Sequence, residues 1–400
     1  MPTRPCWVDV STQALEQNLK FIGGIVPPHA ELLAIVKADA YGHSVRLCAP
    51  AAVRAGVRWL GVTSVEEGVA VRELCPHARI LVMGGIFPGQ GGALLQHDLT
   101  AVAWDPAQFG EIEAAARQRH ALPASLPIHL EIDSGMSRQG AAPNHLAPLL
   151  ARFSPPSPLR LEAVMTHLYA SDETDGRTTA CQLRRLEEAL ASVRDAHCGP
   201  GAGPEWLSAG ASAALLGNDA ASVGALAHRS GLKLMMRPGL ALYGVAPRFM
   251  PPSPASEEPP ALSAARARLQ PVLAWKTRVV SVRDIPAGTG IGYNGTFVAS
   301  EAMRVALIAA GYADGLDRRL GNRFSLLVRG QRTPLVGRIS MDQAVLDVTE
   351  IPGVETGDEV VIIGTQGAET ITAFDHADAA GTIPWEVFTR IGARVPRIAV

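Results

Sequence analysis

Residues 31–75 read ELLAIVKADAYGHSVRLCAPAAVRAGVRWLGVTSVEEGVAVRELC, and this stretch decides the fold. Two short apolar runs, ELLAIV and WLGV, alternate with two longer runs, SVRLCAPAAVRAG and VEEGVAVRELC, that are expected to be helical. A short apolar run, partly β-branched, is typical of a strand that is buried on both faces of a parallel sheet. Strand and helix in regular alternation predict right-handed βαβ units.

The same alternation extends outward over residues 10–245. Further strands are expected in ARILVMGG, LTAVAW, PIHLEIDSG and LEAVMTHL, and further helices in QALEQNLKFI, FGEIEAAARQRH and TTACQLRRLEEALASVRDAH. The number of units is near eight, so a closed barrel is favoured over an open sheet. The sequence therefore predicts an amino-terminal (β/α)8 TIM-like barrel.

The pattern changes after residue 245. The segment RFMPPSPASEEPPALSAARA, residues 248–267, is rich in Pro, Ser and Ala, which favours a surface insertion or linker. Strands separated by Gly and Pro turns are expected beyond it, in VLAWKTRVVSVRDI, RVALIAAGY, FSLLVRG, QRTPLVGRISMDQAVLDVT and DEVVIIG. The fold class is therefore α/β plus all-β, with a mainly antiparallel β domain over residues 246–400 and residues 1–9 packed with it.

Composition limits the kinds of partner. A length of 400 residues favours two domains, and a formal net charge of -2 gives no electrostatic footprint for nucleic acid or an anionic membrane. The five cysteines are scattered without a CxxC pair, so neither a disulfide framework nor a thiolate metal site is indicated. The start, MPTRPCWVDVSTQALEQ, has no apolar region of signal-peptide length. We therefore expect a cytoplasmic protein that acts on a small molecule.

Lys37 stands at the carboxyl end of the first barrel strand, where a buried amine is costly. One interpretation is structural: the amine reaches the rim of the barrel or pairs with a carboxylate such as Asp39. The other is chemical: a desolvated amine, kept partly neutral, forms a Schiff base. The spacing alone leaves both interpretations open.

Other polar side chains follow strands of the same barrel, and active sites of such barrels lie at the carboxyl ends of the strands. Small residues around Ser212, and the amides of Gly239 and Leu240, are suited to a phosphate. Each of these residues has a common structural interpretation, but their joint placement favours one site. The candidates at strand ends are Lys37, Tyr41, Arg138, His167 and Arg237.

Seven segments in order carry a resemblance to a known family. AIVKADAYGH resembles the pyridoxal-phosphate attachment motif of alanine racemases, and IHLEIDSGMSRQG, MTHLYASDE, MRPGLALYG, IGYNGT, AGYADG and GRISMDQAVLDV are similar to later segments of that family. The resemblance covers nearly the whole chain. Single-barrel pyridoxal-phosphate-binding proteins lack the β domain that holds the last three segments, so the complete set is specific.

The resemblance implies a pyridoxal 5'-phosphate cofactor bound to Lys37 as a Schiff base. It places Tyr41, Ser212 and the amides of Gly239 and Leu240 at the phosphate. His167 is expected to pack against the pyridine ring, with Arg138 beside the phenolic oxygen. Arg237 is expected to face the pyridine nitrogen, and because a guanidinium keeps its proton, the ring would be a weaker electron sink.

Racemisation needs an acid-base group on each face of the substrate Cα, because a single base would only exchange the hydrogen that it removed. The resemblance implies Lys37 for one face and Tyr293, from the partner subunit of a homodimer, for the other. Tyr312 and the Met341 backbone, also contributed across the interface, match groups that receive the substrate carboxylate, with Asp342 as an orienting group. A tyrosine between glycines is also common in turns.

Two positions depart from the family. Ala393, in IGARVPRI, stands where some members have a tyrosine that narrows the substrate pocket, so strict alanine specificity is in doubt. Glu131 stands where many members have a carbamylated lysine. We predict that Glu131 replaces that carbamate and orients Arg138 by a charge-assisted contact. The alternative is a barrel carboxylate that pairs with some other basic group.

Four functions remain distinct hypotheses. The first is an alanine racemase that supplies D-alanine, a peptidoglycan precursor. The second is a broader or serine-preferring racemase, which a panel of substrates would separate. The third is a non-catalytic pyridoxal-phosphate-binding protein, disfavoured by Tyr293 and the β domain. The fourth is a cofactor-free Schiff-base aldolase, which a pyridoxal absorbance band would exclude. No metal is expected.

Overall fold

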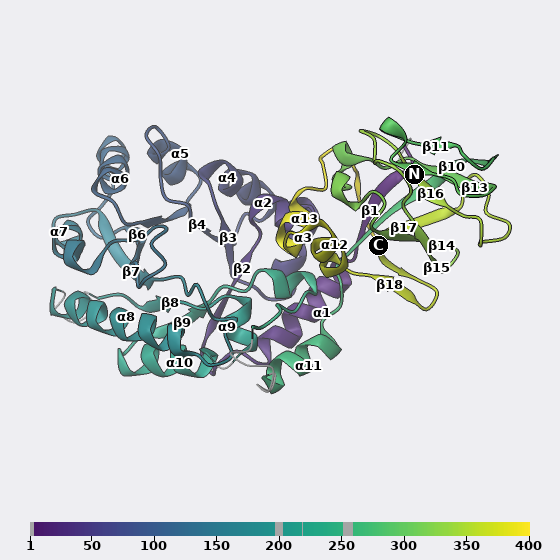
Figure 1. Cartoon of the computed structure of the whole chain (residues 1–400). Coiled ribbons are helices and arrows are strands. Elements are labelled where there is room, and N and C mark those ends of the chain that lie inside the picture. Colours follow the sequence, from purple (N-terminus) through teal and green to yellow (C-terminus); the bar gives the residue numbers. More distant parts are fainter. Residues whose placement is uncertain (1–3, 197–202, 218, 251–258) are drawn as a thin grey trace. The chain divides into compact units, whose positions relative to one another are not determined.

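The computed structural model describes residues 4–196, 203–217, 219–250 and 259–400. The chain divides into two compact units (Figure 1). The barrel unit comprises residues 13–40 and 48–270, and the β unit comprises residues 1–12, 41–47 and 271–400.

Eight parallel strands close the barrel, each hydrogen-bonded to the next along the chain and β9 to β2. Their apolar side chains are almost all buried, as the continuous apolar runs of the sequence require. The fold prediction for this part is confirmed. The strands are β2 Glu31–Ile35, β3 Trp59–Val62, β4 Arg79–Val82, β5 Thr100–Ala103, β6 Leu126–Glu131, β7 Leu159–Met165, β8 Trp206–Ser208 and β9 Lys233–Met236.

Helices flank the strands on the outside of the barrel (Figure 1). Their amphipathic faces point inward: in α8, for example, Leu183, Leu186, Leu190 and Val193 are buried at helical spacing. These helices are α1 Thr12–Gly23, α3 Val45–Arg54, α4 Val65–Leu74, α5 Gly91–Gln96, α6 Pro106–Gln118, α7 Leu146–Leu150, α8 Arg177–Ala196, α9 Ser212–Leu216, α10 Asp219–Arg229 and α11 Pro260–Arg268.

Helix α11 corrects one prediction. The sequence favoured a linker over residues 248–267, but residues 260–268 form a helix that belongs to the barrel unit. Leu262 and Ala265 are fully buried, so packing stabilises a helix that Pro and Ser content argued against. The rest of the Pro-rich text, residues 251–258, lies outside the described residues.

The β unit is a mainly antiparallel sheet with strand order β15-β14-β17-β10-β1-β19, so this part of the fold prediction is also confirmed. Strand β1 pairs antiparallel with β10 and parallel with β19. The strands are β1 Cys6–Val10, β10 Leu273–Ile285, β11 Gly290–Ile291, β12 Phe297–Val298, β13 Met303–Ile308, β14 Ser325–Val328, β15 Gln331–Pro334, β16 Ala344–Asp347, β17 Glu359–Gln366, β18 Glu369–Ile371 and β19 Arg397–Ala399.

One predicted strand run of the β unit is divided in the structure, and a few helices and turns lie between its strands. The run 331–349, predicted as one strand, forms two strands, β15 and β16, because Leu335 to Gln343 make a loop. Over residues 271–400 the only α-helices are near the carboxyl end, α12 Ala373–Ala380 and α13 Pro384–Thr389. Single 3-10 turns at Tyr293–Gly295, Tyr312–Asp314 and Arg318–Leu320 interrupt the loops.

The short element α2, Lys37–Tyr41, follows the first barrel strand and is not a right-handed helix. Ala38, Asp39, Ala40 and Tyr41 all have φ between 52° and 56°, the left-handed region that residues with a Cβ seldom occupy. Such strain persists only where surrounding contacts over-determine the backbone, and it often marks a functional site.

Candidate active site

The predicted residues of the barrel unit lie where its strands end. Lys37 comes two residues after β2, His167 comes two residues after β7, and Arg237 directly follows β9. Arg138 lies in the loop after β6, and Ser212 begins α9 in the loop after β8. Since parallel strands present all their carboxyl ends at one mouth of a barrel, these side chains belong to one end of it.

Lys37 is half-buried, and the pKa of its amine is lowered, first by burial and then by the positive charge of Arg138, with a smaller contribution from Arg237. Glu67 opposes the change. A lowered pKa increases the fraction of neutral amine, which is the nucleophilic and proton-accepting form. The environment therefore suits Schiff-base chemistry rather than a purely structural ion pair.

Glu67 was not predicted as a site residue, yet it anchors the strained turn. Its two carboxylate oxygens accept hydrogen bonds from the backbone amides of Ala38 (2.8 Å) and Thr63 (2.7 Å). The Ala38 amide directly follows Lys37, so Glu67 fixes the start of the left-handed turn. The only sequence signal was a glutamate in the first turn of a predicted helix, which is common at helix starts.

Arg237 is 5% exposed, and two hydrogen-bond acceptors hold its guanidinium. Its guanidinium donates to Ser208 Oγ (2.9 Å) and to the Thr166 carbonyl (2.8 Å), and Nη2 lies 3.5 Å from His167 Nδ1. Burial lowers the pKa of Arg237 to about 10, so it stays protonated at neutral pH. Burial and the charge of Arg237 lower the pKa of His167 to about 3, so the imidazole is neutral.

Ser212 and the segment after Arg237 bring polar groups to one point. Ser212 Oγ accepts from the amides of Gly239 (3.0 Å) and Ala241 (3.2 Å), and Leu240 lies between them. A hydroxyl beside converging backbone amides is a donor set that suits an oxyanion such as phosphate. Tyr41 is 9% exposed, and burial raises its pKa to about 12, so its phenol remains a proton donor.

The structure corrects the predicted contact of Glu131. Glu131 Oε2 accepts a hydrogen bond from Gln139 Nε2 (2.6 Å), and the same nitrogen donates to the Met83 carbonyl (3.1 Å). Within the described residues Arg138 makes no direct hydrogen bond or ion pair with Glu131. Gln139 is the hydrogen-bond partner of Glu131 instead.

Glu131 and Arg138 nevertheless share surroundings. Both line a small pocket, together with Gln139, Thr166 and His167. Burial raises the pKa of Glu131, while Arg237 and Arg138 act in the opposite direction. Gln139 was missed as a site residue because an isolated glutamine in the sequence gives no signal of what it contacts.

The remaining predicted residues lie in loops of the β unit, and their side chains are open to solvent. Tyr293 is 66% exposed, Met341 52% and Tyr312 42%, and Asp342 is also exposed. Large exposed side chains on ordered loops are typical of surfaces that meet a partner or a ligand. The roles predicted for these four residues stay predictions.

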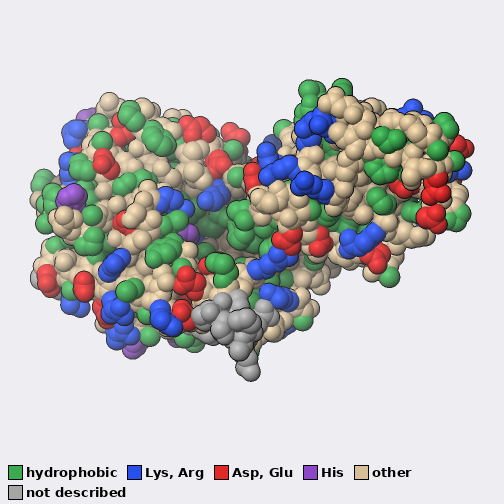
Figure 2. Space-filling view, viewed as in Figure 1, with side chains coloured by type: hydrophobic (Ala, Val, Ile, Leu, Met, Phe, Trp, Pro, Cys, Tyr) green, Lys and Arg blue, Asp and Glu red, His purple; other side chains and the backbone are tan. Residues whose placement is uncertain are grey.

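The described residues give no sign of a metal site or of a membrane-spanning helix. They hold no group of three His, Cys, Asp or Glu side chains that suits a metal ion, and none of their helices is long and apolar enough to cross a membrane. On the face drawn in Figure 2, acidic and basic side chains are interspersed over the barrel unit. A small-molecule site therefore accounts best for the polar groups at the barrel mouth.

Two family models match the chain. The model described as alanine racemase, N-terminal domain, matches residues 10–247, and the model described as alanine racemase, C-terminal domain, matches residues 272–399. The chain is 38% identical over 395 residues to an alanine racemase of Symbiobacterium thermophilum, covering 98% of this chain and 97% of that protein. It is 35% identical over 397 residues to an alanine racemase of Halothermothrix orenii, covering 99% and 97%.

Solved structures resemble the whole fold. The alanine racemase of Streptomyces lavendulae, which produces D-cycloserine, is 31% identical and superposes with a TM-score of 0.86, covering 100% of this chain and 98% of that one. The alanine racemase of Bacillus anthracis, solved with bound L-Ala-P, is 30% identical with a TM-score of 0.84, covering 100% and 96%.

Proposed function

Because this chain belongs to the alanine racemase family, we propose that it interconverts L-alanine and D-alanine by a two-base mechanism with pyridoxal 5'-phosphate as cofactor. It is an enzyme of the isomerase class. The state of Lys37 carries this proposal, since a half-buried amine with a lowered pKa stands at the carboxyl end of a barrel strand, under the influence of two arginines.

The residues at the barrel mouth fit the proposed cofactor. Lys37 would attach it, and the donors that converge on Ser212 Oγ suit its phosphate. When bound, pyridoxal phosphate withdraws electrons from the substrate Cα and makes its C–H acidic. The residues that would hold the cofactor are Lys37, Tyr41, Arg138, His167, Ser212, Arg237, Gly239 and Leu240.

Two bases act on opposite faces of the substrate Cα. Lys37 Nζ would take or return the proton on one face, and Tyr293 Oη would do so on the other. The lowered pKa of Lys37 helps because only the neutral amine accepts a proton. Tyr293 suits the second position because its side chain is largely exposed on a loop and so is open to a second surface.

Arg237 limits the reaction to proton transfer at Cα. Its guanidinium is fixed by Ser208 and Thr166 and stays protonated near neutral pH, so it would donate a hydrogen bond to the pyridine nitrogen without giving up its proton. A ring that gains no proton withdraws electrons less strongly. Return of the proton to Cα is then favoured over competing reactions.

The substrate carboxylate would be received by Arg138, Tyr312 and the Met341 amide, with Asp342 as an orienting group. A guanidinium, a phenol and a backbone N–H are all donors, as a carboxylate requires. Tyr293, Tyr312 and Met341 would come from the partner subunit, so we propose a homodimer. We further propose that the enzyme is cytoplasmic and supplies D-alanine as a peptidoglycan precursor.

A second candidate function is a racemase of broader specificity, favoured by one observation. Ala393 is exposed, and it stands where some members of the family have a tyrosine that narrows the pocket. Pockets reject a small added group by only about 1 to 3 kcal/mol, so serine should be accepted with a modest loss. Serine turnover below detection beside brisk alanine turnover would rule this candidate out.

One experiment tests the main proposal. Purified protein should show a visible absorbance band of pyridoxal that borohydride shifts and traps on Lys37, and polarimetry should show D-alanine converted to L-alanine. A band without racemisation would support a non-catalytic pyridoxal-phosphate-binding protein instead. Borohydride trapping with no pyridoxal band would favour a cofactor-free Schiff-base enzyme.

A further inference from the structure

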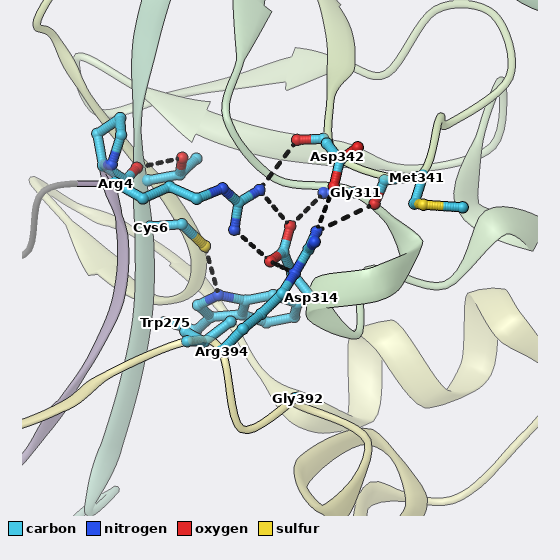
Figure 3. A network of polar contacts seen from close by, with 12 residues as sticks. Arg4, Cys6, Trp275, Gly311, Asp314, Met341, Asp342, Gly392 and Arg394 are labelled. Atoms are coloured by element: carbon cyan, nitrogen blue, oxygen red, sulfur yellow. Dashed lines mark hydrogen bonds and ion pairs between the residues drawn. The ribbon is translucent and has the colours of Figure 1, made fainter.

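A buried carboxylate in the β unit is held by two arginines from distant parts of the chain (Figure 3). The Asp314 side chain is 0% exposed. Arg4, just before β1, donates to both of its carboxylate oxygens, with Nη2 at 2.7 Å, and Arg394, just before β19, donates through Nε at 2.7 Å. We name Arg4, Asp314 and Arg394 the Asp314 clamp.

Asp314 also organises the loop that carries Tyr312. Asp314 Oδ2 accepts from the Gly311 amide (2.8 Å), and the Asp314 amide donates to the Gly311 carbonyl (3.0 Å), so the turn closes on itself. The Asp314 carbonyl accepts from the Gly392 amide (3.0 Å), which ties this turn to the segment carrying Arg394. Three loops therefore meet at one buried carboxylate.

The Met341 loop is bound to the Tyr312 loop, backbone against backbone. The Tyr312 amide donates to Ser340 O (3.0 Å), and the Ala313 amide donates to Met341 O (3.0 Å). A Cβ at Gly311 would lie 2.4 Å from Ser340 O and Met341 O, so only glycine permits this approach. Movement of one loop must therefore move the other.

The arginines of the clamp reach the Met341 loop directly. Arg394 Nη2 donates to the Met341 carbonyl (3.3 Å) and pairs with Asp342 Oδ1 (2.7 Å), and Arg4 Nη2 donates to the Asp342 carbonyl (3.1 Å). The Met341 carbonyl thus has two donors. Within the described residues the Met341 amide donates to no acceptor. Its own peptide is fixed through Ser340 O, which accepts from the Tyr312 amide, so the Met341 N–H is held in place and remains available.

The charges in this network favour a rigid arrangement. Two arginines face two aspartates, and the hydrogen bonds are charge-assisted, which makes them shorter and stronger than neutral ones. Burial alone would raise the pKa of Asp314, but the hydrogen bonds from Arg4 and Arg394 keep it below its ordinary value. Asp314 therefore stays ionised at neutral pH, and losing an arginine would leave a buried charge poorly paired.

We propose that Asp314, held by Arg4 and Arg394, is a positioning residue that sets the Tyr312 hydroxyl and the Met341 amide for the substrate carboxylate. This inference rests on the proposed function, which assigns those two groups to the carboxylate. Asp314 itself touches no substrate. It acts through the backbone of the Tyr312 loop, which it binds at Gly311, and through Arg394, which binds both Asp314 and the Met341 loop.

Arg394→Gln tests the proposal, with Arg329→Gln as a matched control. Arg394 is 40% exposed and Arg329 39%, and each donates through Nε to an aspartate of the β unit, at 2.7 and 2.8 Å. The contacts of Arg329 are with residues 352–358, away from both loops. Arg394→Gln removes the ion pairs with Asp314 and Asp342, and Arg329→Gln removes those with Asp358 and Glu355, but only Arg394→Gln loosens the clamp.

The main readout is calorimetric binding of propionate, which is alanine without its amino group, to the holoenzyme. Propionate reports the carboxylate site without chemistry at Cα. Arg394→Gln should weaken propionate binding roughly tenfold, because misplaced donors lose much of their effect. The KM for alanine should rise by a similar factor with kcat changed less, and Arg329→Gln should match the wild type in both.

A second readout follows the loops themselves. Amide hydrogen exchange should quicken in peptides covering residues 311–316 and 339–343 in Arg394→Gln and not in Arg329→Gln. Arg394→Lys keeps the charge but not the fork that spans Asp314 and Asp342, so it should lie between wild type and Arg394→Gln in propionate affinity.

The outcomes separate two failures. A wild-type protein that does not racemise alanine would overturn the proposed function, whatever the exchange data show. An active wild type, with Arg394→Gln that binds propionate as tightly and exchanges the two loops as slowly, would overturn the positioning role alone. Equal weakening in Arg329→Gln would also overturn it, since the effect would then be a general loss of stability.

Discussion

Several neighbouring residues set the pKa of the Lys37 amine, and so whether it is charged or neutral. Burial and the charges of Arg138 and Arg237 favour the neutral form, while Glu67 favours the charged form. The same Glu67 carboxylate binds the amide of Ala38, so one residue affects both the charge of the amine and the direction of its backbone. The reactivity of Lys37 therefore depends on Arg138, Arg237 and Glu67 as well as on the lysine itself.

Tyr293→Phe tests the second base. The variant should keep the cofactor absorbance but lose racemisation by roughly two or more decades, the scale of a missing general acid-base group. Exchange of the Cα hydrogen with solvent deuterium, started from the enantiomer that Lys37 deprotonates, should persist. Near-normal racemisation by this variant would show that another group serves that face.

Glu131→Gln tests the role of the buried carboxylate. The change removes a negative charge near Arg138 and Arg237 while keeping the shape, and Gln139 loses a charged acceptor. We expect kcat/KM to fall roughly tenfold, as for one charge-assisted hydrogen bond. Wild-type turnover should be the same with and without bicarbonate, because no carbamate is needed. A Gln variant indistinguishable from wild type would contradict this role.

Among single residues, Lys37 was predictable because a strand end can be inferred from an apolar run. Its partners were not. Glu67 and Ser208 act through contacts between segments that are far apart in the chain, and hydrophobic periodicity carries no information about such contacts. The Glu131 prediction had the correct neighbourhood and the wrong partner, because a single glutamine in the sequence gives no signal of what it contacts.

Among the elements, the turn α2 combines two constraints. Four consecutive residues adopt left-handed angles, and Gly42, with φ of 77°, then approaches α13 so closely that a Cβ would lie 2.3 Å from Phe388 O. Gly42 also accepts a hydrogen bond from Arg397 through its carbonyl (3.0 Å). The segment after Lys37 is thus fixed at both ends, which preserves its strain.

The sequence predicted strand and helix positions well where the apolar pattern was long. It predicted them poorly where an element is too short to show a pattern or follows text of another composition. Strand β8 spans only Trp206–Ser208, too short to be recognised by its pattern, and the barrel closes because its neighbours on both sides hold it in register. Helix α11 was missed because its Ala-rich sequence, which favours a helix, directly follows Pro-rich text and was interpreted together with it.

The contact between α12 and β17 gives a pH prediction. His376 is fully buried, its Nε2 lies 2.8 Å from Ile362 O, and its ring packs on Phe324. Burial lowers its pKa from 6.5 to about 4. Between these values the unfolded chain binds more protons than the folded one, so stability falls as pH is lowered through this window.

His376→Gln removes the titrating group but keeps an N–H donor. Its urea midpoint should therefore fall less than that of the wild type between pH 6.5 and 4. The difference in unfolding free energy across this window should reach about 3 kcal/mol, at 1.36 kcal/mol per pKa unit. Parallel curves for the two proteins would show that His376 does not titrate on unfolding.

For the whole molecule, the two proposed bases lie in different compact units, Lys37 in the barrel unit and Tyr293 in the β unit. A site shared across subunits predicts complementation. Lys37→Ala and Tyr293→Phe should each be inactive as homodimers, but a mixed dimer holds one intact site. After denaturation and joint refolding of equal amounts, about a quarter of the wild-type sites should be restored, since half of the dimers are mixed.

The control for complementation is each variant refolded alone, which should stay inactive. Activity that fails to appear in the mixture, although mixed dimers are detected by differential tagging, would contradict a site that is shared between subunits. Protein that sediments as an active monomer would contradict it more directly.

The pairing of β1 has a consequence for synthesis on the ribosome. Residues 6–10 are translated before the whole barrel, and their partners, β10 and β19, after it. At about 5 to 20 residues per second, the 263 residues from Val10 to Leu273 take roughly 13 to 50 s. The barrel strands are complete within that time, whereas β1 waits as an unpaired strand. Pairing of β1 with β10 must therefore follow synthesis of the barrel strands, and pairing with β19 comes later still, so β1 keeps an unpaired edge for the whole time in which the barrel is made.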